Sequence, residues 1–359
     1  MVQYPSPSEI INFVKNPVFI HDLVIKGGQI VTSATGVPER YTGGFAITFK
    51  FKIGDDLWAF RCWHNGIENA EDRYAKFSKI VEADKLPYFC EFHFEKDGMF
   101  IPGALNNPYP TTRMRWVEGD NFKDYICKHR DKEKLLALAE KFKKMCIDLH
   151  DARLSHGDLQ EGNIKVNEEQ EIFLIDYDSM YHPSMGQMEM STAGLHNYQH
   201  PQRGKCLYSS EKDDYFSEII IYLTILAVAY KPSILDEYNI VPGSDTTLFT
   251  VDDFRNITAS KIYNELKALD PVFEKPLEIL ETYLRATDFS KLDFFVDLLD
   301  TKPSISLSSD KSFVMIGRQT PVTLSWKIKN TTNAALYRGS VLVKEISANG
   351  SITLNFRRF

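Results

Sequence analysis

The chain has 359 residues, 43% of them hydrophobic and 25% charged, which is typical of a globular protein with two or three domains. Its formal net charge of −7 argues against a nucleic-acid partner, because phosphate recognition requires a basic surface. The five cysteines are scattered without CxxC spacing, which predicts neither a zinc site nor disulfides and favours a cytoplasmic location.

The first part of the chain, residues 1–118, is predicted to be rich in β-strands. Residues 41–63, YTGGFAITFKFKIGDDLWAFRCW, have alternating apolar runs around a Gly-Asp-Asp turn, which predicts a hairpin. Residues 69–83 have the apolar spacing of a helix. Two more strands are expected in residues 88–101, which contain a predicted Lys-Asp-Gly turn, and in residues 111–117.

Helices are predicted to dominate residues 119–300. Residues 131–154 carry apolar side chains at helical spacing, namely Leu135, Leu138, Phe142, Met145 and Leu149. The longest apolar run, Ile219–Tyr230, is shorter than the roughly 20 residues of a membrane span, so it predicts a buried helix and no membrane partner. The N-terminal sequence MVQYPSPSEI does not predict a signal peptide. Further helices are expected within residues 259–269, 274–286 and 291–299.

Residues 301–312, rich in Ser, Pro and Lys, predict a linker before a strand-rich segment, residues 313–359. In that segment Val322, Leu324, Trp326 and Ile328 alternate with other residues, as in a half-buried strand. This pattern resembles the start of bacterial immunoglobulin-like modules. Four or five short strands are few for an independent sandwich, so we expect the segment to dock on the rest of the chain or on a protein partner.

The chemistry of the chain is concentrated around LSHGDLQEGNIKV, Leu154–Val166, and the apolar strand IFLID that ends at Asp176. Phosphoryl transfer from ATP needs one carboxylate to orient the attacking hydroxyl, and a metal held by another carboxylate and an amide oxygen. Asp158, Asn163 and Asp176 supply these groups. A loop and an adjacent strand end can gather such oxygen ligands around Mg²⁺.

These residues resemble the motifs of the protein kinase-like superfamily. HGDLQEGN matches its catalytic loop, and IDYD resembles its metal-binding Asp-Phe-Gly motif. The resemblance covers roughly residues 25–300. It implies an α+β, bilobal fold with a β-rich N-lobe and an α-helical C-lobe, followed here by a small all-β segment.

The resemblance also implies roles for individual residues. Asp158 is the expected catalytic base, acting with Asn163, while Asn163 and Asp176 are the expected metal ligands. His156 is expected to brace the loop, and one of Asp213 or Asp214 to clamp its backbone. ATP is expected to bind at Gly43, Gly44, Arg61, Met114, Trp116 and Val117.

The N-lobe departs from the family pattern. Arg61 stands where the family has a lysine that contacts the α- and β-phosphates, and a planar guanidinium is not equivalent to an ammonium. Lys50 and Lys52 on the preceding strand are alternative phosphate contacts, and no clear Gly-x-Gly-x-x-Gly motif is present. The acid expected to pair with Arg61 is Glu71, with Glu68 and Glu82 as alternatives. Asp178 replaces the glycine of the metal motif.

Other departures concern the acceptor and regulation. Gly157 replaces an arginine that binds an activation-loop phosphate in regulated protein kinases, so that form of switching is not expected. Gln160 replaces a lysine of protein Ser/Thr kinases, and His-Gly-Asp also occurs in small-molecule phosphotransferases. Residues 196–204, in contrast, lie where protein kinases dock peptides.

Three hypotheses remain. The first is an enzyme that transfers the γ-phosphate of Mg²⁺-ATP to a hydroxyl, in the first place of protein Ser or Thr. The second is a pseudokinase that binds nucleotide or serves as a scaffold, and the third is a small-molecule kinase. The retained set Asp158, Asn163 and Asp176 favours the enzyme. The histidines of the downstream loop, His182, His196 and His200, fit a packed loop better than a metal site.

Overall fold

The computed structural model describes residues 4–66, 70–105, 107–190, 194–299, 304–312, 319–329, 334–346 and 349–357. The chain forms two compact units, Met1–Leu292 and Asp293–Phe359. The first unit mixes helices with antiparallel sheets, and the second is mainly strands. The unit boundary precedes the linker predicted at residues 301–312, because the short helix α11 (Phe295–Leu299) belongs to the second unit.

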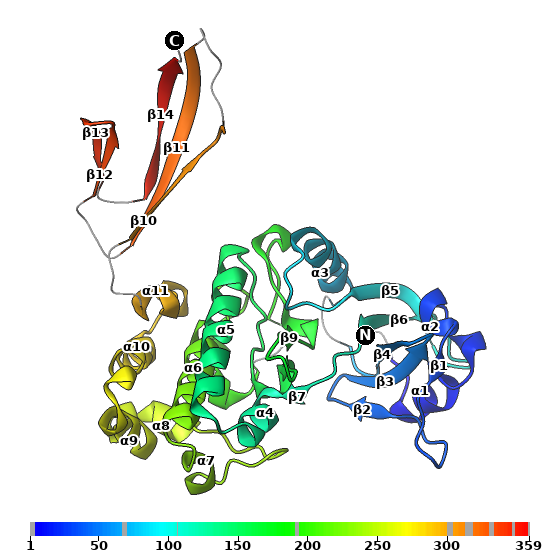
Figure 1. Cartoon of the computed structure of the whole chain (residues 1–359). Coiled ribbons are helices and arrows are strands. Elements are labelled where there is room, and N and C mark those ends of the chain that lie inside the picture. Colours follow the sequence, from blue (N-terminus) through cyan, green and yellow to red (C-terminus); the bar gives the residue numbers. More distant parts are fainter. Residues whose placement is uncertain are drawn as a thin grey trace. The chain divides into compact units, whose positions relative to one another are not determined.

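A six-stranded antiparallel sheet forms the N-terminal part of the first unit (Figure 1). Its strands are β1 (Gln29–Ile30), β2 (Arg40–Thr42), β3 (Ala46–Ile53), β4 (Asp56–Trp63), β5 (Phe92–Met99) and β6 (Tyr109–Arg115). They lie in the order β1-β3-β4-β6-β5, and β2 also pairs with β3. The predicted hairpin is confirmed as β3 and β4, joined at Gly54, whose φ of 61° favours glycine.

The alternation of side chains gives this sheet two different faces. Phe49 and Phe60 are fully buried and share a hydrophobic core with Ile10. Each such aromatic contributes about 1.5–3 kcal/mol when it is buried. Two helices cover this face, α1 (Pro7–Phe13) and α2 (Leu23–Lys26). The opposite face carries Thr48 and Arg61, which line a cavity described below.

The prediction of a Lys-Asp-Gly turn in residues 88–101 is wrong. β5 runs through these residues, and its register with β6 shifts between Glu95 and Met99. Gly98 lies so close to Thr111 of β6 that any side chain at position 98 would overlap it. The glycine therefore permits close strand approach at an irregularity in the sheet instead of a reversal of the chain.

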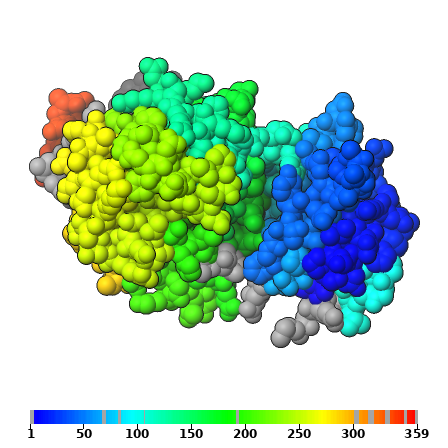
Figure 2. Space-filling model, turned by 90° about the horizontal axis from the view of Figure 1, so that it is seen from below, coloured from blue at the N-terminus to red at the C-terminus, as the bar shows by residue number. Residues whose placement is uncertain are grey.

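The helical pattern of residues 69–83 is confirmed by α3 (Ala70–Asp84). Most other helices follow in the second half of the first unit: α4 (Phe122–Lys128), α5 (Lys132–Asp151), α6 (Tyr215–Tyr230), α7 (Ile234–Glu237), α8 (Val251–Arg255), α9 (Lys261–Leu269) and α10 (Glu274–Arg285). The sheet part, in blue, and the helical part, in green and yellow, occupy separate regions of the surface in Figure 2.

Helices α5 and α6 pack against each other in the helical part. All the apolar positions predicted for α5 are buried, and so is nearly every residue of α6, as predicted. Among the described residues, no helix combines the length and hydropathy of a membrane span. The loop His156–Asn163 leads into a three-stranded sheet next to these helices. Its strands are β7 (Asp120–Asn121), β8 (Ile164–Val166) and β9 (Ile172–Leu174).

The second unit contains two small antiparallel sheets. One is β10-β11-β14 and the other β12-β13: β10 (Ser304–Ser309), β11 (Gln319–Lys329), β12 (Ala334–Arg338), β13 (Val341–Ile346) and β14 (Gly350–Arg357). Trp326 is buried with Leu336 and Ile346, as the alternation predicted. The linker prediction is wrong for Ser304–Ser309, because Ile305 and Leu307 alternate with serines and the segment pairs with β11 along its whole length.

Candidate active site

A cavity of about 400 Å³ lies between the six-stranded sheet and the three-stranded sheet. This volume is in the range of small-molecule sites. The cavity is lined by most of the predicted ligand-binding residues: Gly43, Arg61, Met114, Trp116, Val117, Asn163 and Asp176. Gly44 and Asp158 are not among the lining residues, although Asp158 contacts Asn163 directly.

The two glycines between β2 and β3 have different positions. The N–H of Gly43 donates to the carbonyl of Ala46 at 2.9 Å, and Gly43 lines the cavity. The carbonyl of Gly44 accepts a hydrogen bond from Asn65 at 2.8 Å, and a Cβ on Gly44 would meet nothing within 4 Å. Gly43 thus brings backbone to the cavity, whereas Gly44 completes the turn.

The end of β6 and the residues after it form an apolar wall. Met114 pairs with Ala59 of β4, and the ring of Trp116 lies 5.6 Å from that of Tyr41. The ammonium of Lys50 lies 4.6 Å from the centre of the Trp116 ring, a cation–π contact. Neither Lys50 nor Lys52 is among the described residues that line the cavity, so Arg61 is the sheet's cation there.

Arg61 is held by two carboxylates and a hydroxyl. Its Nη1 donates to Asp176 Oδ1 at 2.9 Å and to Asp178 Oδ1 at 2.8 Å, while Nη2 donates to Asp178 Oδ2 at 2.5 Å. Nη1 also lies 3.1 Å from the hydroxyl of Tyr74 on α3, which donates to Asp178. A bidentate guanidinium–carboxylate pair of this kind is strong and directional.

The charges in this cluster are coupled. Burial raises the pKa of Asp178 to about 6, although the charge of Arg61 stabilises its carboxylate. Burial acts in the same direction on Asp176, but there Arg61 prevails and holds the pKa below its usual range. One guanidinium therefore serves two carboxylates, and Asp176 is the more fully ionised of the two.

The expectation that Glu71 pairs with Arg61 is wrong. The carboxylate of Glu71 lies 4.0 Å from Lys96 at the half-exposed first turn of α3. Glu68 and the side chain of Glu82 lie outside the described residues. The acid that pairs with Arg61 is Asp178 instead.

Helix α3 is also fixed to the segment that follows the metal motif. Arg73 is fully buried and donates to the carbonyls of Met180 at 3.0 Å and Glu189 at 2.5 Å. Lys76 donates to the carbonyl of Met185 at 2.9 Å. These contacts fix the position of α3 relative to residues 180–189.

The catalytic-loop motif has a backbone that requires glycine. Gly157 has a φ of 76°, and a side chain there would run into the carbonyl oxygen of Ser179. A side chain at this position would require the backbone at Ser179 to shift, which is a steric reason for glycine at residue 157. His156 is fully buried, and its Nε2 donates to the carbonyl of Ile175 at 3.0 Å, so it braces the loop.

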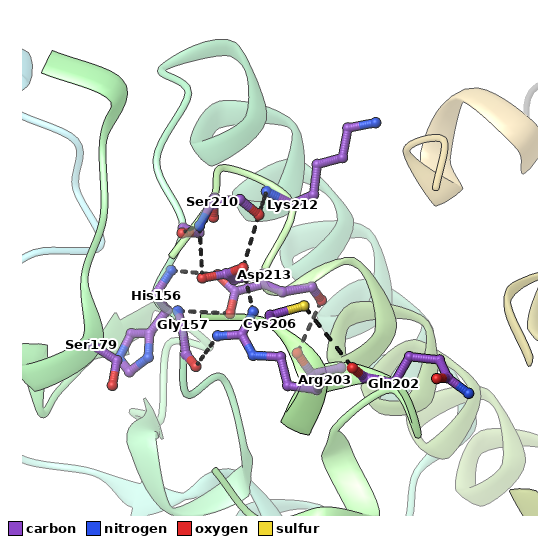
Figure 3. Close-up of polar contacts among 12 residues, drawn as sticks. His156, Gly157, Ser179, Gln202, Arg203, Cys206, Ser210, Lys212 and Asp213 are labelled. Atoms are coloured by element: carbon purple, nitrogen blue, oxygen red, sulfur yellow. Dashed lines mark hydrogen bonds and ion pairs between the residues drawn. The ribbon is translucent and has the colours of Figure 1, made fainter. Parts of the chain in front are cut away.

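Asp214 is the residue that clamps this loop. Its Oδ2 accepts from the N–H of His156 and its Oδ1 from the N–H of Gly157 at 2.9 Å. Asp213 forms a buried ion pair with Arg203, which in turn donates to the carbonyl of Gly157 at 3.3 Å (Figure 3). Both acids before α6 therefore support the same loop, one directly and one through an arginine.

Asp158 and Asn163 are in direct contact. The amide of Asn163 donates to the carbonyl of Asp158 at 2.8 Å and to its Oδ2 at 3.2 Å. The other oxygen, Oδ1, is buried and has no hydrogen-bond partner. Burial raises the pKa of Asp158 to about 6, against the opposing effect of His156. A carboxylate with this pKa is suited to accept a proton near neutral pH.

Asp176 has a strained backbone. Its φ is 65° and its ψ is 78°, in the left-handed region that residues with a Cβ rarely adopt. Such a conformation lowers the stability of the fold by about 1–2 kcal/mol, and residues that adopt it are more frequent at functional sites. The Asp176 carboxylate accepts a hydrogen bond from Arg61, and Asp176 lines the cavity together with Asn163.

Tyr74 and Lys165 are among the cavity residues that the sequence did not single out. The hydroxyl of Tyr74, on α3, gains its polar partners from Arg61 and Asp178, which are distant in the chain. Lys165 lies within the strand motif IKV, and its Nζ donates to the carbonyl of Gly119 at 3.3 Å. Burial lowers the pKa of Lys165, which places a weakly hydrated cation on the cavity wall.

Within the described ranges, no three His, Cys, Asp or Glu side chains gather closely enough to hold a metal alone. Of the three downstream histidines, His200 is buried and its Nε2 donates to the carbonyl of Tyr283 at 2.8 Å. Asp176 and Asn163 still suit Mg²⁺, which takes one or two protein oxygens and completes its shell with phosphates and water.

No protein-family model matches the chain, and no curated protein is significantly similar to it.

Proposed function

We propose that the chain is an ATP-dependent phosphotransferase of the protein kinase-like type, with the six-stranded sheet in the N-lobe and the helical part as the C-lobe. One observation carries this proposal. Arg61 and Asp176 line the same cavity as Asn163, and Asn163 is hydrogen-bonded to Asp158. These groups come from three separate segments, and together they match the requirements of phosphoryl transfer.

The cavity suits a nucleotide in this orientation. The apolar wall of Met114, Trp116 and Val117 fits a purine base, which packs well against aromatic and aliphatic side chains. Arg61 and the backbone at Gly43 lie in the part that would face the phosphates. A second unit with an immunoglobulin-like fold and a cytoplasmic location are also part of the proposal.

The reaction follows from the position of Asp158. The acceptor hydroxyl gives its proton to the Asp158 carboxylate as its oxygen bonds to the γ-phosphorus. The bond from the γ-phosphorus to the bridging oxygen breaks, and ADP leaves with the electron pair. Mg²⁺, held by Asn163 and Asp176, would neutralise phosphate charge in this reaction. Asn163 keeps the Asp158 carboxylate in place through its amide hydrogens.

The test is transfer from [γ-³²P]ATP by the full chain, with Asp158→Asn as the variant. A general base contributes about 10²–10⁴-fold to the rate, so the variant is expected to lose transfer by that factor and to keep ATP affinity. Equal incorporation by the two proteins would contradict the proposal.

A nucleotide-binding scaffold is the second candidate function, favoured by the bond between Arg61 and Asp176. That bond occupies the carboxylate a metal would need. Thermal shifts with ATP, with and without Mg²⁺, separate the two. The enzyme predicts a larger shift with Mg²⁺ present, and a scaffold that binds nucleotide without metal predicts equal shifts.

A further inference from the structure

Two buried polar atoms near the catalytic loop lack a hydrogen-bond partner. One is Oδ1 of Asp158, and the other is Nε2 of Gln199, a residue only 5% exposed. Each orphaned group costs about 1–3 kcal/mol, so folding alone does not favour either of them. Unsatisfied buried groups at a site of this kind indicate a missing ligand.

The two atoms face the same place. Gly194 has a φ of 69°, and a Cβ built on it would lie 2.6 Å from Gln199 Nε2 and 2.7 Å from Asp158 Oδ1. An acceptor and a donor therefore flank one position next to a glycine. Any side chain on residue 194 would overlap both atoms, so only glycine allows the backbone to lie this close to them.

Neighbouring groups do not compete for this position. The second oxygen of Asp158 is held by Asn163. The glutamine within the loop, Gln160, uses its side-chain oxygen to accept from the N–H of Gly162 at 2.7 Å. Gln199 therefore supplies the amide N–H that lies beside the unpartnered oxygen of Asp158.

A carboxylate oxygen beside an amide N–H selects a hydroxyl. A hydroxyl donates one hydrogen bond and accepts others, so it satisfies both groups at once. A carbonyl can use only the amide, and an ammonium only the carboxylate.

We propose that Asp158 Oδ1 and Gln199 Nε2 form the subsite for the acceptor alcohol, which Gly194 covers in this structure. This assignment rests on the proposed function. The alcohol donates its hydrogen to Asp158, the direction in which the proton later moves, and accepts from Gln199. Neither atom is reached by solvent in this structure, so the acceptor displaces the contact of residues 194–199 with Asp158 when it enters.

The test compares Gln199→Met and Gln199→Leu with Gln202→Met in the full chain. Gln202 lies on the same segment, and its side chain points away from the catalytic loop (Figure 3), so Gln202→Met is the matched control. Transfer from [γ-³²P]ATP to dephosphorylated casein measures kcat, calorimetry measures ATP affinity, and melting measures stability.

Both Gln199 variants are expected to lose at least about tenfold in kcat, because the amide that positions the acceptor hydroxyl is removed. Their ATP affinity is expected to stay at the wild-type value and their Tm is not expected to fall, since Nε2 makes no hydrogen bond that the substitution could break. Gln202→Met is expected to behave as wild type.

If the Gln199 variants transfer phosphate with the same kcat as the wild type, the subsite is overturned and the proposed function is left intact. A loss of kcat together with a Tm several degrees lower would also overturn it, because the amide would then be structural. Absence of transfer by the wild type would overturn the proposed function and the subsite together.

Discussion

The two sides of the cavity are held by different forces. On the loop side, Asp214 and Arg203 bind the backbone of Gly157 through buried hydrogen bonds. On the sheet side, Arg61 is shared by the carboxylates of Asp176 and Asp178. A metal or a phosphate would compete for the charges of the sheet side but has no access to the bonds of the loop side. We therefore expect ligands to leave the hydrogen bonds of the loop side unchanged and to alter the ion pairs of Arg61 on the sheet side.

The largest effect is expected from loss of the clamp on the loop side. Asp214→Ala removes two buried hydrogen bonds that the carboxylate accepts from backbone N–H groups, each contributing about 1.5–3 kcal/mol. We expect the free energy of unfolding to fall by about 3–5 kcal/mol, measured by urea titration. Asp252→Ala, at an exposed carboxylate, is the control and should change little. Equal stability of the two variants would show that the loop is not held by this clamp.

A smaller loss is expected on the sheet side. Asp178→Ala leaves Arg61 with Asp176 as its remaining carboxylate, and we expect a loss of about 2 kcal/mol, because part of the pairing survives. A double-mutant cycle with Arg61→Met measures the coupling, expected at about 1–3 kcal/mol. Additive losses would mean that the pair contributes no coupling energy.

Strain at the loop can be tested by Gly157→Ala. The left-handed φ and the overlap with Ser179 predict a loss of about 1–2 kcal/mol in unfolding free energy. Gly204→Ala is the matched control, because a Cβ there meets nothing within 4 Å. If the two glycine variants unfold at the same denaturant concentration, the backbone requirement at residue 157 is refuted.

The smallest effects concern pH. Burial raises the pKa of Asp158 to about 6, and the base must be ionised, so kcat should rise with pH with a midpoint near 6. Transfer rates between pH 5 and 8 test this. A pH-independent kcat across that range would exclude Asp158 as the titrating base.

The raised pKa that makes kcat rise with pH makes the stability of the fold decrease with pH. The folded pKa of Asp158 and of Asp178 lies above the usual 3.8, so the folded state binds more protons between about pH 4 and 6. Their contribution to stability is fully present below pH 4 and is lost as the pH rises through about 6. Asp178→Asn should flatten this pH dependence in urea titrations. An unchanged slope would show that Asp178 is ionised throughout.

Much of the loop side could be predicted from sequence, because its residues are local. Asp158 and Asn163 lie on one short loop, and Asp214 starts an apolar helix whose burial follows from composition. The two alternatives, Asp213 and Asp214, were separated by the structure alone, since both are buried and adjacent.

On the sheet side the cavity residues could be predicted, but the partners of Arg61 could not, because they are distant in the chain. Arg61 and Asp178 are 117 residues apart, and no spacing rule links them. The sequence singled out Glu71 as the acid expected to pair with Arg61 and did not single out Tyr74. In the structure Glu71 lies on a partially exposed turn of α3 and Tyr74 lies on its buried face, so Tyr74 is the residue of the two that contacts Arg61. Both positions depend on how α3 packs.

The central claim is that the groups around this cavity transfer phosphate. Its most direct measurement is ³²P incorporation from [γ-³²P]ATP at saturating ATP and Mg²⁺ by the wild type and by Asp158→Asn. We predict incorporation by the wild type and a loss of about 10²-fold or more in the variant at matched ATP binding. ATP binding by both proteins without incorporation by either would contradict the claim and identify the chain as a nucleotide-binding scaffold.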